Sequence, residues 1–427
     1  MSLPTLARQL ERLAGTATLG ARHLLGLDTN PVPADWTHVT KVDPEEAKLL
    51  PLAYPLYLSH TSAVAVGGSA DVTDRNTEET FALLSPLSVP AFHEPSAPSH
   101  VTETTYREAE FLAVPEVLNG ESEALVGTLG EALSYVREEK GPTLLEEAIG
   151  YRFDGPLGDR LFDFATAYLH QEAVFEAYLI MNPDSAAARR AGVTEADLLS
   201  PTAARERALA ATYHLDSEVV YLEYSGTFGG DEAVDILEAV ADGVSWPRIW
   251  YGGGLDSREK AERVLDAGAD AVVVGDIFHD IADLEVELYE RVQATHSPGE
   301  KAPPVTDLEA WVAEEVDVAS TSAAAYLSTI PDISDPVGRA RSYLAAAIHT
   351  RLSIAALADG STTRADANAG DQVDASPPGA THLESVLGAD SEAVARQLAR
   401  GILAEEGHEA AVADEDRLPV HHLATTL

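Results

Sequence analysis

The chain has 427 residues, and 71 acidic residues against 28 basic ones give it a formal net charge of −43. It contains no cysteine, which excludes disulfides and thiolate metal sites, and no basic patch that would favour nucleic-acid binding. No run of about 18 apolar residues predicts a membrane-spanning helix. The carboxylates are spread along the whole chain, which is typical of a halophilic cytoplasmic protein, because molar salt screens charge beyond about 3 Å.

The N-terminal segment, residues 1–34, predicts a helical extension. Leucines recur at helical spacing from Leu3 to Leu25, and Arg8 and Glu11 interrupt the apolar run, so the segment is not a signal peptide. Such an amphipathic helix has two interpretations. It packs on the body of the protein, or it makes a peripheral contact with a membrane surface and receives a lipid substrate there.

Eight short runs rich in β-branched or aromatic residues predict strands that alternate with helices. They are Thr37–Asp43, Ala63–Ser69, Val89–Glu94, Glu110–Leu118, Ala177–Pro183, Val219–Gly226, Arg248–Gly254 and Ala271–Asp276. This alternation predicts an α/β fold, a closed (β/α)8 TIM barrel over residues 35–296. The alternative is an open doubly wound sheet, but no glycine-rich fingerprint follows the first strand.

Two connections depart from a regular barrel. Residues 95–109 are too few for a full helix after the third strand. Residues 119–176, between the fourth and fifth strands, form an aromatic-rich insertion that is either a helical lid or packing on the barrel.

The composition changes near residue 297, where a Pro- and Gly-containing stretch is typical of a linker. We therefore expect residues 297–427 to form a helical appendage, separate from the active site, that serves association or docking. It should contain two helices within residues 305–357, a disordered connector at residues 358–378 and a further helix at residues 383–406.

Candidate metal and phosphate ligands lie at the ends of the first two predicted strands. Asp43 and Ser69 suit Mg²⁺, which binds one or two carboxylates together with substrate phosphate oxygens. Lys41 suits a phosphate contact, and Gly67 and Gly68 let the backbone approach a diphosphate. The alternative for Lys41 and Asp43 is a surface ion pair.

The sixth strand carries the candidate base. Tyr221, Glu223 and Ser225 alternate, so they share one face, and Gly226 follows them directly. A carboxylate inside a barrel is unfavourable unless it is used or paired. We expect Glu223 to act as a general base or to accept a substrate hydroxyl, with a structural ion pair as the alternative.

Two consecutive glycine-rich turns form a candidate phosphate site. Gly252, Gly253 and Gly254 end the seventh strand, and Gly275 and Asp276 end the eighth. Backbone N–H groups in these two loops hold phosphate in many (β/α)8 barrels, although ordinary strand-to-helix turns are the alternative. Three other polar residues near strand ends either line the site or fill space: His93, Glu94 and Glu116.

Together these motifs resemble the geranylgeranylglyceryl phosphate synthase family, including its bacterial heptaprenylglyceryl phosphate synthase branch. The resemblance keeps the order of the family's motifs across roughly residues 35–295. The motifs are Lys41-Val42-Asp43-Pro44, Gly67-Gly68-Ser69, Asn182-Pro183-Asp184-Ser185, Tyr221-Leu222-Glu223-Tyr224-Ser225-Gly226, Tyr251-Gly252-Gly253-Gly254 and Val274-Gly275-Asp276.

The resemblance implies a modified barrel whose helix after the third strand is missing or replaced. It implies Mg²⁺-dependent transfer of a geranylgeranyl or similar group from its diphosphate to sn-glycerol 1-phosphate, which makes the first ether bond of archaeal membrane lipids. By position, Asp43 and Ser69 would hold Mg²⁺, and Lys41 would meet glycerol phosphate. The other substrate-binding residues would be Tyr221, Leu222, Glu223, Tyr224, Ser225, Gly226, Gly252, Gly253, Gly254, Gly275 and Asp276.

Two features differ from the family pattern. Asp276 stands where the family usually has Asn, and residues 118–125 lack the aromatic residues that the family carries beside the prenyl site. A second hypothesis is therefore a non-catalytic paralogue that binds a polyol phosphate and acts as an interaction protein. A different barrel enzyme for a sugar or indole phosphate would not explain the motif at 221–226. Assembly into a homo-oligomer is left open.

Overall fold

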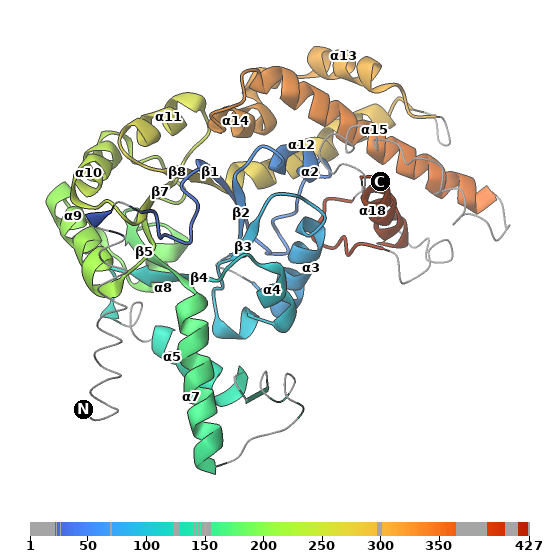
Figure 1. Cartoon of the computed structure of the whole chain (residues 1–427). Coiled ribbons are helices and arrows are strands. Elements are labelled where there is room, and N and C mark those ends of the chain that lie inside the picture. The colour runs from blue at the N-terminus through green and yellow to red at the C-terminus, as the bar shows by residue number, and fades with distance from the viewer. Residues whose placement is uncertain are drawn as a thin grey trace, which may run out of the picture.

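The computed structural model shows a barrel of eight parallel strands among the residues that it describes (Figure 1). Those residues are 22, 24, 25, 27–68, 71–122, 128–140, 142, 143, 146, 150, 155–296, 301–363, 391–405 and 417–425. The strands are β1 (His38–Val42), β2 (Ala63–Val66), β3 (Ala91–His93), β4 (Ala113–Val117), β5 (Val174–Ile180), β6 (Val219–Glu223), β7 (Arg248–Gly252) and β8 (Ala271–Val274). All eight predicted strands are confirmed. β5 begins earlier than predicted, because the charged Glu176 conceals the start of its apolar run.

The sheet closes into a ring. The strand order is β3-β2-β1-β8-β7-β6-β5-β4, and a parallel bridge between His93 and Leu112 joins the two ends. Backbone hydrogen bonds from His93 N to Phe111 O (3.1 Å) and from Glu110 N to Ala91 O (2.8 Å) complete this seam. The (β/α)8 barrel is therefore confirmed, and the open sheet is excluded.

Successive side chains along each strand face the barrel interior and the surrounding helices in turn. Val39, Phe92, Tyr221 and Trp250 belong to the interior cluster. Leu222 belongs to the larger cluster between strands and helices. This alternation decides which residues of the motif at 221–226 reach the site.

The helices of the barrel lie outside the strands. They are α2 (Tyr54–Leu58), α3 (Asp74–Leu84), α4 (Glu103–Glu108), α8 (Ala186–Ala191), α9 (Pro201–Ala210), α10 (Gly230–Gly243), α11 (Arg258–Asp266) and α12 (Asp276–Gln293). As expected, the connection after β3 is short: α4 has only 6 residues and follows a 3-10 turn at Pro98–His100. The helix after β1 is also reduced, since α2 has 5 residues.

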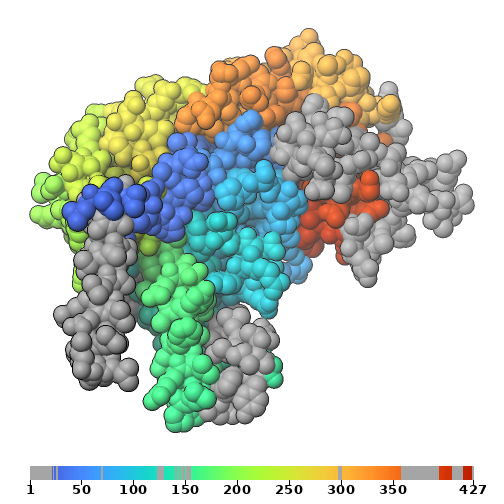
Figure 2. All heavy atoms as spheres, in the orientation of Figure 1, coloured from blue at the N-terminus to red at the C-terminus, as the bar shows by residue number. Residues whose placement is uncertain are grey.

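The insertion between β4 and β5 is helical. It comprises α5 (Thr128–Tyr135), a π-helical turn (Val136–Lys140) and α7 (Gly155–Glu172). In Figure 2 the insertion, in green, projects from one side of the body, and the C-terminal helices, in orange, lie on the opposite side.

The described residues after 300 form α13 (Val305–Glu315), α14 (Ser322–Thr329), α15 (Pro336–Thr363) and α18 (Ser391–Glu405). The sequence predicts two helices within residues 305–357, but three begin there: α13 and α14 lie inside this range, and α15 extends beyond it. α15 extends to Thr363, into the stretch predicted to be a disordered connector, and the remainder of that stretch lies outside the described residues.

These C-terminal helices pack as part of the barrel, contrary to the expectation of a separate appendage. Tyr326 of α14 belongs to the same buried cluster as Val42 of β1. Its hydroxyl lies 2.7 Å from Thr40 Oγ1, and Thr329 Oγ1 lies 3.0 Å from His38 Nε2. α14 thus covers the outer face of β1, which the short α2 leaves open.

No helix in the described part of the chain is long and apolar enough to cross a membrane. The helix expected within residues 1–34 lies largely outside the described residues. Arg22 is described: its guanidinium carbon lies 3.3 Å from the centroid of the Trp246 ring, and it pairs with Asp216 at 2.6 Å.

Candidate active site at the carboxyl ends of the strands

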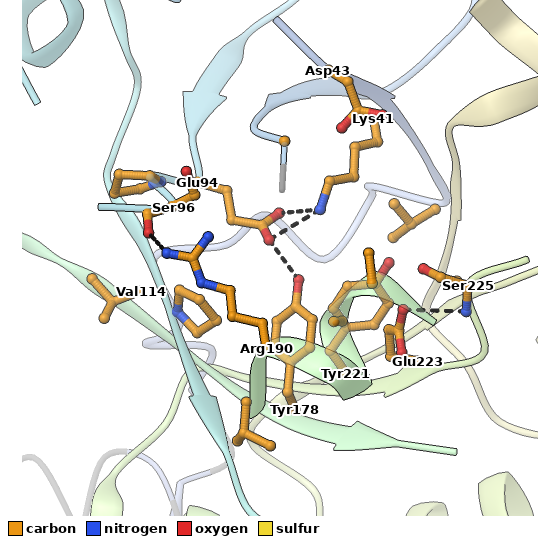
Figure 3. Close-up of a pocket in the computed structure, with 18 of the residues that line it drawn as sticks. Lys41, Asp43, Glu94, Ser96, Val114, Tyr178, Arg190, Tyr221, Glu223 and Ser225 are labelled. Carbon is orange, nitrogen blue, oxygen red and sulfur yellow. Dashed lines mark hydrogen bonds and ion pairs between the residues drawn. The ribbon is translucent and has the colours of Figure 1, made fainter. Parts of the chain in front are cut away.

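One cavity of about 990 Å³ opens where the strands end (Figure 3). Asp43, Glu223, Gly252 and Gly275 all line it, so the ends of β1, β6, β7 and β8 converge on one mouth of the barrel. Ser69, the second predicted metal ligand, lies outside the described residues. The convergence that the sequence predicts is therefore present for the four residues that are described.

Glu223 is the buried carboxylate of the cavity, with 2% of its surface exposed. Its Oε1 accepts a hydrogen bond from Ser225 N at 3.2 Å, and its Oε2 has no hydrogen-bond partner among the described residues. Burial raises the pKa of Glu223, while the hydrogen bonds from Ser225 and the charge of Lys41 oppose that rise. One carboxylate oxygen is therefore oriented by the protein, and the other is available to a ligand.

Residues of β6 divide between the cavity and the outer core. Tyr221, Ser225 and Gly226 line the cavity with Glu223. The family resemblance assigns Leu222 and Tyr224 to the substrate, but their side chains belong to the cluster between strands and helices. This corrects the assignment, because alternate residues of a strand point to opposite faces. Tyr224 accordingly faces α10, where its Oη donates to Glu232 Oε1 at 3.1 Å.

Gly252 makes room for Tyr221. A Cβ atom at position 252 would lie 2.1 Å from Tyr221 Oη, far inside contact distance. The glycine in the first phosphate turn thus has a packing role, because it lets the Tyr221 ring stand at the floor of the cavity.

Lys41 is bound to a carboxylate across the mouth of the barrel (Figure 3). Its Nζ lies 3.0 Å from both carboxylate oxygens of Glu94, and Tyr178 Oη donates to Glu94 Oε1 at 2.8 Å. Burial lowers the pKa of Lys41, but the charges of Glu94 and Asp43 outweigh it and raise the pKa overall. The two carboxylates therefore favour the charged form of Lys41. Glu176 lies buried below it, and burial raises the pKa of that carboxyl well above its ordinary range.

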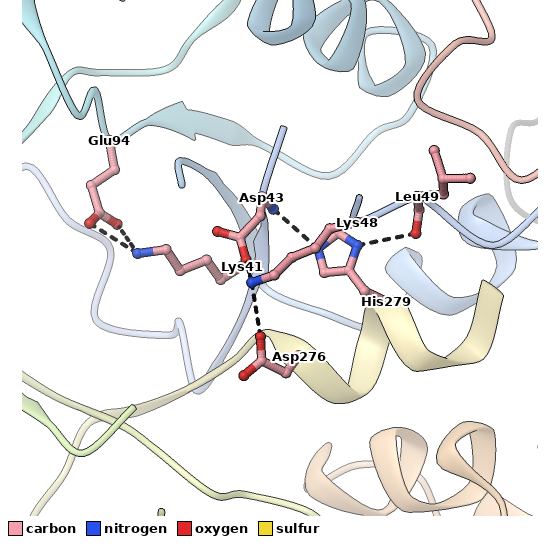
Figure 4. Close-up of polar contacts among 7 residues, drawn as sticks. All are labelled: Lys41, Asp43, Lys48, Leu49, Glu94, Asp276 and His279. Atoms are coloured by element: carbon pink, nitrogen blue, oxygen red, sulfur yellow. Dashed lines mark hydrogen bonds and ion pairs between the residues drawn. The ribbon is translucent and has the colours of Figure 1, made fainter. Parts of the chain in front are cut away.

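A second cation, Lys48, lies at the candidate metal ligand (Figure 4). Lys48 Nζ forms a short ion pair with Asp43 Oδ2 and a second one, at 3.0 Å, with Asp276 Oδ1. A positive group therefore already occupies a place beside the Asp43 carboxylate. The Asp43 carboxylate offers a hard anionic oxygen to the cavity. A single carboxylate of this kind fits a Mg²⁺ ion that is bound mainly through substrate phosphates and water. No cluster of three or more His, Cys, Asp or Glu side chains within the described residues suggests an all-protein metal site.

The two predicted phosphate turns lie side by side in the cavity. Gly253 and Gly254 have positive φ angles of 144° and 56°, and added Cβ atoms would meet the backbone of Tyr224 and of Phe228 at 2.5 and 2.4 Å. Gly275 precedes α12, an 18-residue helix whose first residues, Asp276 and Ile277, line the same cavity. Backbone N–H groups at such turns and helix starts suit an anion.

The cavity continues from this polar end into an apolar arm. The arm runs between β4 and β5 on one side and the insertion on the other, and its lining includes Val114, Leu133, Val136, Leu169 and Phe175. Among the described residues, none beyond Asp280 lines the cavity. The insertion, and not the C-terminal helices, therefore supplies the apolar surface that residues 118–125 lack.

The sequence interpretation did not single out Lys48, Tyr178 and Arg190, which line the cavity and make polar contacts there. Arg190 Nη2 forms a short hydrogen bond with Ser96 O at the rim of the cavity. Lys48 carried a usable signal, because lysine is rare in this chain and it follows Asp43 closely. Tyr178 and Arg190 carried none. Of the uncertain residues, Glu94 lines the cavity, whereas His93 packs outward on Phe81 and Glu116 accepts from Ser217 at 3.0 Å.

Comparison with known proteins agrees with this geometry. The sequence pattern of the PcrB family matches residues 33–294. The chain is 31% identical over 270 residues to the geranylgeranylglyceryl phosphate synthase of Haloquadratum walsbyi, covering 62% of this chain and 97% of that one. It is 33% identical over 252 residues to the enzyme of that name from Halobacterium salinarum, covering 58% and 89%.

Among solved structures, (S)-3-O-geranylgeranylglyceryl phosphate synthase from Thermoplasma acidophilum in complex with sn-glycerol-1-phosphate is 22% identical. It has a TM-score of 0.41 and covers 57% of this chain and 86% of that one. The resemblance read from the motifs is thus confirmed by the sequence comparisons. Since the family pattern spans well over half of its length, the chain belongs to the PcrB family.

Proposed function

We propose that this protein is a Mg²⁺-dependent prenyltransferase that joins geranylgeranyl diphosphate, or a similar prenyl diphosphate, to sn-glycerol 1-phosphate. The relatives named above support the proposal by their names. The observation that carries it is that one cavity joins glycine-rich phosphate turns, a buried carboxylate and a long apolar arm. A site for a sugar phosphate would need the first two features but not the third.

The acceptor would bind at the polar end. The turns at Gly253–Gly254 and Gly275 would hold its phosphate through backbone N–H groups, and this would direct a glycerol hydroxyl to Glu223. Glu223 Oε2, which has no partner among the described residues, would accept the hydroxyl hydrogen bond. As the reaction proceeds, Glu223 would take the proton, a contribution of about 10²–10⁴-fold to rate.

The donor would place its prenyl chain in the apolar arm and its diphosphate beside Asp43, Lys48 and Arg190, all of which line the cavity. Asp43 would hold Mg²⁺, and the bound ion would supply charge neutralisation for the departing diphosphate. The C1–O bond of the prenyl diphosphate breaks with its electron pair on diphosphate, and the glycerol sn-3 oxygen forms the new bond to C1. The buried walls keep water from competing for that carbon.

The test is an assay with labelled geranylgeranyl diphosphate in molar KCl, with and without Mg²⁺. We expect lipid-extractable product with sn-glycerol 1-phosphate and none with its enantiomer, sn-glycerol 3-phosphate, because the held phosphate would direct a different group to Glu223. Binding of sn-glycerol 1-phosphate by calorimetry without transfer from any donor, from farnesyl to heptaprenyl diphosphate, would contradict the proposal and favour the non-catalytic paralogue.

A further inference from the structure

Two buried histidines from distant parts of the chain lie side by side near Asp43, and one of them holds its backbone. Asp43 N donates to His279 Nε2 of α12 at 3.1 Å (Figure 4). His422, near the C-terminus, packs beside His279, and the two imidazole rings lie 6.4 Å apart. The exposed fractions of His279 and His422 are only 7% and 3%. The candidate metal ligand is therefore fixed through its main chain, not only through its carboxylate.

Helix α12 and the C-terminal tail, which carry these two histidines, also fix the far end of the loop that follows β1. His279 Nδ1 lies 3.1 Å from Leu49 O, so the imidazole bridges Asp43 and Leu49 as the neutral tautomer with its proton on Nδ1. The C-terminal tail, residues 417–425, runs alongside: Leu50 N donates to His422 O at 2.9 Å, and Ala424 N donates to Leu50 O at 3.0 Å. Lys48 lies between the two fixed ends of this loop.

A buried ion pair holds the tail in turn. Arg351 of α15 donates to Ala424 O and lies 3.8 Å from Glu285 Oε2 of α12. Glu285 accepts hydrogen bonds from Leu52 N at 2.6 Å and Ala53 N at 3.2 Å. A continuous buried network therefore joins α15, α12 and the tail to the segment that runs from Asp43 to Ala53.

We infer that the C-terminal tail positions the metal site. By pairing with Leu50 and packing His422 against His279, which holds the Asp43 backbone, it keeps the loop after β1 in the conformation that presents Asp43 and Lys48 to the cavity. His279 and His422 are positioning residues, since the hydrogen bonds of the His279 ring go to backbone atoms and the His422 ring packs beside it. The inference rests on the proposed function insofar as Asp43 binds Mg²⁺. Its physical basis is that loss of a group which orients a metal ligand typically lowers metal affinity by about 10–100-fold.

The chain offers matched variants for a test. His422→Ala removes the tail's ring contact with His279, and His421→Ala is its control, because His421 is about half exposed and pairs with Glu405 at 3.1 Å. His279→Ala removes the bridge between Asp43 and Leu49. His279→Gln keeps one donor and one acceptor and is its conservative rescue.

Each full-length variant is measured in three ways. Turnover and the Mg²⁺-induced rise in melting temperature are titrated against Mg²⁺, and hydrogen exchange is followed at the Asp43 and Leu50 amides. We expect His422→Ala and His279→Ala to raise the Mg²⁺ concentration for half-maximal effect by about 10–100-fold and to accelerate exchange at these amides. The KM for sn-glycerol 1-phosphate should stay near the wild-type value in all variants. The control His421→Ala and the conservative variant His279→Gln should also keep the wild-type Mg²⁺ dependence and amide exchange.

Two results would overturn the inference and leave the proposed function standing. One is that folded His422→Ala and His279→Ala keep the wild-type Mg²⁺ dependence in both titrations. The other is that turnover falls equally at every Mg²⁺ concentration, as a general loss of folded protein would cause. A wild-type protein that shows neither Mg²⁺-dependent turnover nor a Mg²⁺-induced shift in melting temperature would overturn the proposed function, and the inference with it.

Discussion

Glu223 has its two carboxylate oxygens in different situations. Oε1 is anchored by the Ser225 amide, while Oε2 is buried without a partner among the described residues. The polar end of the cavity thus contains a proton acceptor that a hydroxyl can reach without first displacing a protein hydrogen bond.

Glu223→Gln should lower turnover by about 10²–10⁴-fold and leave sn-glycerol 1-phosphate binding nearly intact, because the amide keeps the shape but cannot accept the proton. Single-turnover kinetics and calorimetry on the same preparation check this. Wild-type turnover in the variant would remove Glu223 from the role of base.

The same substitution should change the pH dependence of stability. Burial raises the folded-state pKa of Glu223 above its ordinary value of 4.5, so folding favours the protonated form. The wild type therefore has this stability in full below pH 4.5 and loses it as pH rises through the raised pKa. We expect the melting temperature of Glu223→Gln, relative to wild type, to increase from pH 4.5 to neutral pH. A constant difference would contradict the assigned shift.

Gly252 should tolerate no side chain. In Gly252→Ala the new Cβ would overlap Tyr221 Oη, so we expect a loss of about 1–3 kcal/mol in unfolding free energy and a higher KM for sn-glycerol 1-phosphate. Gly130→Ala is the control, because nothing lies within 4 Å of that Cβ, and alanine should stabilise α5 by about 0.5–1 kcal/mol. Urea unfolding measures both, and equal effects would refute the packing argument.

At the scale of elements, the insertion between β4 and β5 lines the apolar arm of the cavity. α5 and α7 pack near β4 and β5 so that their apolar side chains line the arm of the cavity. One face of α7 meets the cavity, and the other carries exposed residues such as Phe164 and Tyr168. The two faces permit a test within one helix.

Leu169→Asp should weaken prenyl diphosphate binding by at least about tenfold, since a charge in an apolar pocket must be desolvated, and should leave glycerol phosphate binding unchanged. Phe164→Asp, at a position that is 70% exposed on the same helix, should leave both unchanged. The KM for geranylgeranyl diphosphate, measured for both variants and the wild type, tests this expectation. If the two variants behave alike, the arm does not hold the prenyl chain.

For the whole molecule, the helices after residue 300 complete the barrel. α14 and α15 contribute to the same buried cluster as the strands and α12, and the tail pairs with Leu50. Truncation after residue 296 should therefore give an insoluble or unfolded chain, assessed by circular dichroism in molar KCl. A folded truncated protein with full activity would contradict the shared core.

The hydrogen bond between Thr40 and Tyr326 gives a finer measure of that coupling. Tyr326→Phe leaves the buried Thr40 hydroxyl without this partner and should reduce unfolding free energy by about 1–3 kcal/mol. The double variant Thr40→Val with Tyr326→Phe should recover part of the loss, since neither group then remains unsatisfied. Strictly additive losses would indicate that the two groups are not coupled.

Several features followed from the sequence alone because they depend on neighbouring residues. Apolar runs bounded by glycines located the strands, and the two-residue period placed Tyr221, Glu223 and Ser225 on one face. The same period places Leu222 and Tyr224 on the opposite face, toward the outer cluster, although both belong to the family motif. Strand order in a barrel then brought Asp43, Gly252 and Gly275 to one mouth, because all parallel strands end there.

Other features were decided by the tertiary structure. Lys48 joins Asp43, five residues away, to Asp276, 228 residues away, and the C-terminal tail pairs with Leu50. Such contacts arise from how helices pack around the barrel, and no local pattern encodes them. The packing of the C-terminal helices is decided in the same way: they look like a separate unit in sequence, and only the fold shows that α14 contacts β1, the strand that precedes the candidate metal ligand.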